Sequence, residues 1–150
     1  MRTILAALLV CLATAGASAQ PGASGPVATL NAEARDFSDS HPDRSLAAAT
    51  KAHAAAKQTG DVRGEAEALN YMAYGYRNQS VLELSRQYAL ESVRLYVQAG
   101  DQWGEAQGYN TLGLIEADDA RYAEALDAHL KALAIRERIG DKEGLAYSHN

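Results

Sequence analysis

The stretch Gly100-Asp101-Gln102-Trp103-Gly104-Glu105-Ala106 decides the fold, because it recurs in the chain. A first copy runs from Gly60-Asp61 to Gly64-Glu65-Ala66, and a third begins at Gly140-Asp141 and reaches Ala146. The copies start at residues 60, 100 and 140, so the period is 40 residues without a gap. Asparagines keep the same register, at positions 70, 110 and 150. Self-similarity at a fixed period of this size predicts a repeat architecture.

Each period contains two helical patterns. In the second full period, Asp101 is expected to cap a helix from about Gln102 to Ala117, since its carboxylate can accept free backbone N–H groups of the first turn. Asp118-Asp119 is expected to break this helix and cap the next one, which Gly140 ends in a left-handed turn. In the preceding period, Ser80-x-x-Glu83 has the form of a capping box.

The second helix of this period has a predicted apolar face of residues spaced by four, three and four: Tyr122, Leu126, His129 and Leu133. Small residues also recur at equivalent positions, where they would let neighbouring helix backbones approach closely. These sets are Ala66, Ala106 and Ala146; Ala73 and Gly113; Ser85 and Ala125; Ser92 and Ala132.

The pattern Tyr109-x-x-Leu112-Gly113 … Ala125-x-x-x-His129 … Ala132 resembles the tetratricopeptide repeat, over roughly residues 43–150. Glu116 departs from the family pattern, which has an aromatic residue there, and the closing proline is replaced by Gly-Asp. The resemblance implies an all-α fold, a right-handed α-solenoid of antiparallel helix pairs, in the long 40-residue subclass. An armadillo- or HEAT-type helical array is the alternative.

The predicted units follow from the period. Residues 1–19 are expected to be a signal peptide, because a basic start and a short apolar run precede the small residues Ala17-Ser18-Ala19. Cleavage after Ala19 would make the protein secreted or periplasmic; an uncleaved anchor or a lipoprotein at Cys11 are alternatives. The remaining units are a flexible lead-in (20–25), a degenerate first helix pair (26–59), two repeats (60–99 and 100–139) and the first helix of a further repeat (140–150).

Composition and residue spacing argue against several classes of function. The formal charge of −5 argues against nucleic-acid binding. The one cysteine, Cys11, falls in the expected signal peptide, and the histidines (His41, His53, His129 and His149) are not spaced as metal ligands. Asp118-Asp119 is better explained by capping than by acid–base chemistry. We therefore expect no catalytic residues, no metal and no cofactor.

A groove is the expected binding site. In the tetratricopeptide family the first helix of each pair lines the concave side, and the matching positions here are Glu67, Asn70, Tyr74, Arg77, Gln107, Asn110, Leu114, Tyr147 and Asn150. An asparagine amide both donates and accepts, so Asn70 and Asn110 could hold an extended peptide backbone, and Arg77 could bind a carboxylate. Alternatively, the asparagines are only part of the repeat consensus.

Two functions fit. The first is an exported, non-catalytic module that binds a peptide or protein partner. The second is the N-terminal sensory region of a larger signalling enzyme, since the array resembles those of bacterial GGDEF diguanylate cyclases and sensor histidine kinases. Asn150 falls mid-helix by register, so we expect the array to continue beyond it, and a membrane helix could follow. An envelope assembly factor is a third, weaker possibility.

Overall fold

The computed structural model describes residues 25–142 and residue 144, and over these residues the chain is all-α. The described helices are α1 (Pro26–Asp36), α2 (Pro42–Thr59), α3 (Val62–Asn78), α4 (Leu82–Ala99), α5 (Gln102–Asp118) and α6 (Tyr122–Ile139). Each predicted unit between residues 26 and 139 thus holds two helices. The expected signal peptide (1–19), most of the lead-in, and the groove residues Tyr147 and Asn150 lie outside the described residues.

The repeated Gly-Asp turns form as predicted. Gly60, Gly100 and Gly140 have φ angles of 71°, 68° and 70°, which is the left-handed region that glycine adopts without steric cost. The following aspartate caps the next helix: Asp61 Oδ1 accepts from the Gly64 N–H and Asp101 Oδ1 from the Gly104 N–H, both at 2.9 Å. Asp141 makes the same contact with Gly144 at 3.0 Å.

The other two turns were predicted only in part: α5 ends at Asp118, as expected, but the predicted caps of α4 and α6 do not form. Ser80 has a φ angle of 59° and Ala120 one of 58°, so α4 and α6 begin only after Val81 and Arg121. Neither of these cap residues makes a side-chain capping hydrogen bond within the described chain. The Ser80-x-x-Glu83 box therefore does not form. Asp118-Asp119 does not cap α6 either, because Asp118 is the last residue of α5 and Asp119 is its C-cap.

Small residues fill the interfaces between helices, as expected. Ala66, Ala73, Ala89, Ala106 and Ala132 are buried. The serines at such positions also donate to the facing helix, which the pattern of small residues does not predict. Each hydroxyl donates a hydrogen bond to a backbone carbonyl: that of Ser45 to Ala34 at 2.7 Å, that of Ser85 to Ala73 at 2.6 Å and that of Ser92 to Ala66 at 2.7 Å.

The predicted apolar face of α6 was partly wrong. Tyr122 and Leu126 are exposed, His129 and Leu133 are half-buried, and α6 instead buries Ala125, Ala128, Ala132 and Ile135 against the rest of the protein. The smaller side chains face α5 because the two helices approach closely there. Gly113 lies at one such close contact, since a Cβ on it would lie 2.6 Å from His129 Cε1.

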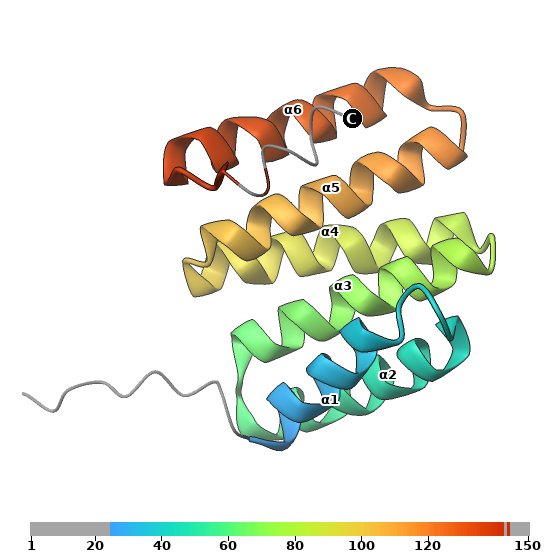
Figure 1. Cartoon of the computed structure of the whole chain (residues 1–150), viewed down its shortest axis with the longest axis vertical. Helices are drawn as coiled ribbons and strands as arrows, with labels where there is room; N and C mark the ends of the chain where they lie inside the picture. The colour runs from blue at the N-terminus through green and yellow to red at the C-terminus, as the bar shows by residue number, and fades with distance from the viewer. Residues whose placement is uncertain (1–24, 143, 145–150) are drawn as a thin grey trace, which may run out of the picture.

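Successive helices pack against one another along the long axis of the molecule, from α1 and α2 at one end to α6 at the other (Figure 1). In addition, α1 contacts α3, and α3 contacts α5. The first helix of each predicted pair therefore lies beside the first helix of the next pair. This row of α1, α3 and α5 positions the candidate site.

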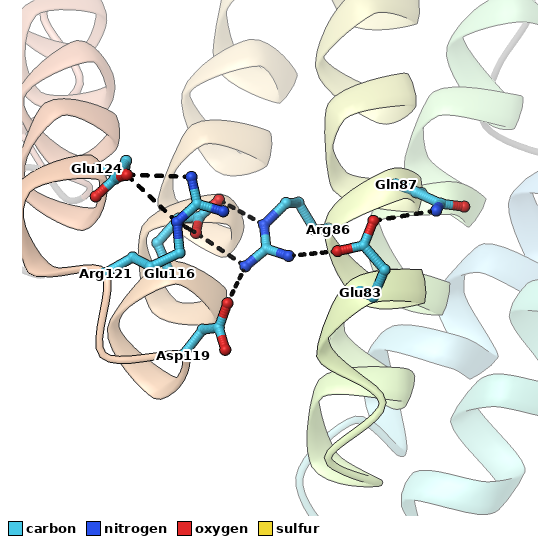
Figure 2. Close-up of polar contacts among 7 residues, drawn as sticks. All are labelled: Glu83, Arg86, Gln87, Glu116, Asp119, Arg121 and Glu124. Atoms are coloured by element: carbon cyan, nitrogen blue, oxygen red, sulfur yellow. Dashed lines mark hydrogen bonds and ion pairs between the residues drawn. The ribbon is translucent and has the colours of Figure 1, made fainter.

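A buried ion pair joins α4 to the end of α5 (Figure 2). Arg86 reaches across from α4 and donates to Glu116 and Asp119, while Glu83 of its own helix accepts from its Nη1 at 2.8 Å. Arg121, in the turn before α6, lies 3.3 Å from Glu116 on the other side. Glu116, which stands where the tetratricopeptide pattern has an aromatic residue, is therefore paired with Arg86 and Arg121.

Candidate functional site

A hollow of about 590 Å³ lies over α1, α3 and α5. Its wall on α3 is made by Glu67, Asn70, Tyr71 and Tyr74, which are spaced so that they share one helix face. The wall on α5 is made by residues on the equivalent face of the next unit: Trp103, Gln107, Asn110, Thr111 and Leu114. The lining also includes Arg35, Ser38 and Asp39 from the end of α1 and the loop after it, and Arg136, Asp141 and Gly144 from the C-terminal part of the described chain.

The hollow brings together six of the sequence-predicted groove residues, Glu67, Asn70, Tyr74, Gln107, Asn110 and Leu114. Arg77 does not line it. Its Nε donates to Asp118 Oδ2 at 2.6 Å, and its guanidinium lies 5.7 Å from the centre of the Tyr74 ring. In this structure Arg77 is thus paired with a carboxylate of its own chain, and its binding to a ligand carboxylate stays a prediction.

Sequence reasoning missed several residues of the hollow. Tyr71 and Trp103 could have been found, because each is four residues before or after a predicted groove residue on the same helix face. Tyr96 could not be found in this way, since it belongs to α4. It reaches the hollow beneath Gly104, where an added Cβ would overlap the tyrosine ring.

Burial sets the protonation of the site. It raises the pKa of the Glu67 carboxyl, although the charges of Arg35 and Arg63 oppose this effect. Burial, followed by the charge of Glu67, raises the pKa of Tyr71 to about 12 and that of Tyr96 well above its ordinary value. Both phenols, which are neutral at physiological pH even without this shift, are hydrogen-bond donors there.

The amides of the site are incompletely bonded. Asn31, buried beneath the hollow, donates from Nδ2 to the Gly64 carbonyl at 2.9 Å and to Glu67 Oε2 at 3.4 Å. The Oδ1 atoms of Asn31 and Asn70 are buried, and neither has a hydrogen-bond partner among the described residues. Buried oxygens of this kind are uncommon in folded proteins and gain free energy when a donor reaches them.

The site thus combines amides, phenols and exposed aromatic surface, and these groups can hold a ligand by hydrogen bonds and apolar contacts. Within residues 25–142 and 144, no group of three or more His, Cys, Asp or Glu side chains is arranged to hold a metal ion. In the same part of the chain, each helix is too short or too polar to cross a membrane.

Comparison with known proteins leaves the family open. A scan against models of known protein families finds no match. A search of curated proteins likewise finds no related sequence.

Proposed function

We propose that this chain is an exported, non-catalytic module of tetratricopeptide type, a right-handed solenoid of antiparallel helix pairs whose hollow binds an extended peptide of a protein partner. The solenoid is supported by the recurrence of the same Gly-Asp cap at 61, 101 and 141 and by the contacts of α1 with α3 and of α3 with α5. Export is supported by the pattern of residues 1–19.

One observation carries the binding function. Asn70 and Asn110, which occupy the same position in successive repeats, line one hollow together. A peptide amide presents a donor and an acceptor at regular intervals, and an asparagine side chain can complement both. Two asparagines at equivalent positions therefore suit an extended backbone, while the residues around them differ and would select side chains.

The test is selection of phage-displayed random heptapeptides on the purified chain. Peptides recovered on the wild type should bind an Asn70→Ala/Asn110→Ala variant at least tenfold more weakly in calorimetry. Asn78→Ala is the matched control, because Asn78 is exposed near the end of α3 and does not line the hollow. Circular dichroism should show equal helicity for all three proteins.

Two results would overturn the proposal. Equal affinity of the double variant would mean that the asparagines are only part of the repeat consensus. A failure of the wild type to enrich any peptide would remove the peptide-binding function itself.

A further inference from the structure

Glu67 is a half-buried carboxylate in the hollow that makes no ion pair among the described residues, although the charges of Arg35 and Arg63 act on it from farther away. Among the described residues, no Lys, Arg or His nitrogen lies within 4.0 Å of its oxygens, and its one hydrogen bond is the 3.4 Å contact from Asn31. Burial raises the pKa of this carboxyl, so the ionised form is disfavoured in the empty hollow. A cation brought within reach would stabilise that form.

The arginines around Glu67 face other carboxylates. Arg35 lies 3.6 Å from Asp36, Arg63 donates to Asp101 Oδ2 at 2.6 Å, and Arg136 lies 3.9 Å from Asp141. Carboxylates also outnumber the cations in the lining of the hollow, where Asp39, Glu67 and Asp141 stand against Arg35 and Arg136. The formal charge of this lining is thus negative.

The other residues around Glu67 could contact the methylene groups of a long basic side chain and accept hydrogen bonds from its charged end. Trp103 is half exposed at the hollow, and Tyr71 follows Glu67 by one helical turn, so aromatic faces are available to methylene groups or to a cation. The unpartnered Oδ1 atom of Asn70, which lines the hollow, is an acceptor, which a carboxylate ligand could not satisfy.

We propose that the hollow takes a lysine or arginine side chain of the bound peptide, with its charged end on Glu67 and its stem against Tyr71 and Trp103. The inference rests on the proposed function, since it names the side chain that the peptide-binding site selects. We expect the hollow not to favour an acidic peptide. Arg77 could attract one, but it is paired with Asp118.

The experiment repeats the heptapeptide selection on the wild type, on Glu67→Gln and on Glu137→Gln. The last is the matched control: it removes the same charge from an exposed position of α6 that does not line the hollow. We expect lysine or arginine at one fixed position of the peptides recovered by the wild type and the control, and loss of this preference in Glu67→Gln. Replacing that residue by norleucine should weaken binding to the wild type at least tenfold, and to Glu67→Gln less than threefold.

The outcomes separate the two proposals. Peptides that bind the hollow without a preference for basic residues, or with a preference for acidic ones, would overturn the role of Glu67 and leave peptide binding intact. An unchanged preference in Glu67→Gln would do the same. Recovery of no peptide at all would overturn both proposals. Lysine-only or arginine-only recovery would support the role of Glu67 and distinguish an ammonium from a guanidinium ligand.

Discussion

The Arg86 guanidinium holds the buried Glu116 carboxylate across the contact between α4 and α5, with Nε at 2.9 Å from Oε1 and Nη2 at 3.1 Å from Oε2. The side chains are 12% and 6% exposed, so this is a buried pair and not a surface one. The hydrogen bonds to Glu116 also raise the pKa of Arg86. At the equivalent positions of the preceding unit stand Leu46 and Tyr76, which pack in one apolar cluster.

Breaking this pair should destabilise the fold. Arg86→Ala leaves Glu116 buried with only the partly exposed Arg121 beside it, so the cost should approach, but not reach, the roughly 3–5 kcal/mol of a buried charge left without any partner. Urea unfolding should show this decrease in the free energy of unfolding. Arg94→Ala, which breaks the exposed pair with Glu91, is the control and should leave the free energy of unfolding nearly unchanged, because solvent screens an exposed ion pair.

The double variant Arg86→Leu/Glu116→Tyr installs the residues of the preceding unit. It should recover most of the lost stability, because well-packed apolar residues replace a buried ion pair at little or no cost. A double variant as unstable as Arg86→Ala would contradict the equivalence of the two interfaces.

The close approach at Gly113 can be tested separately. In Gly113→Ala the new methyl group meets the His129 ring, and overpacking of this kind costs about 1–3 kcal/mol. His129→Ala in the same chain should reduce that penalty, because it empties the space the methyl group needs. The melting temperature checks both variants, and a rise in Gly113→Ala, as the helix propensity of alanine alone would give, would exclude a close contact between α5 and α6 at this point.

The same histidine should make stability depend on pH. Burial, followed by the charge of Arg136, lowers the pKa of His129. The folded state therefore binds fewer protons than the unfolded state, in which the histidine pKa is about 6.5. The resulting stability is present above that value and is lost as the pH falls through the lowered pKa. Urea unfolding between pH 8 and pH 5 should show a shallower decline for His129→Gln than for the wild type; identical declines would contradict this assignment.

If the chain is exported, its signal peptide should be cleaved at one defined bond. The small residues at Ala17 and Ala19 are expected to direct cleavage between Ala19 and Gln20. N-terminal sequencing of the protein recovered from the periplasm or medium should begin at Gln20. Retention of Met1 in that protein would rule out a cleaved signal peptide.

Local signals explain which parts of the fold could be predicted. The Gly-Asp turns depend on residues three apart, since Asp101 needs only the Gly104 N–H, and the sequence therefore located them correctly. The break at Asp118-Asp119 was also located correctly, but the caps of α4 and α6 were predicted wrongly because Ser80 and Ala120 adopt positive φ angles, which their residue types do not suggest.

The features of the site that the sequence did not predict depend on contacts between residues far apart in the chain. Spacing along α3 and α5 was enough to place residues such as Asn70 and Asn110 on one face. The partner of Arg77 could not be foreseen, because Asp118 lies 41 positions along the chain. Tyr96 was missed for a similar reason: it enters from a different helix through the space that Gly104 leaves.

Trp103 offers the most direct test of the claim that the hollow is the binding surface, because it is the one tryptophan of the chain and is 52% exposed at the hollow. A peptide recovered by selection on the wild type should be titrated into the chain while tryptophan emission is recorded. The account predicts a saturating shift of the emission to shorter wavelength, with the affinity found by calorimetry and at least tenfold weaker in Asn70→Ala/Asn110→Ala. A peptide that binds in calorimetry with no change in emission, and equally well to the double variant, would contradict it.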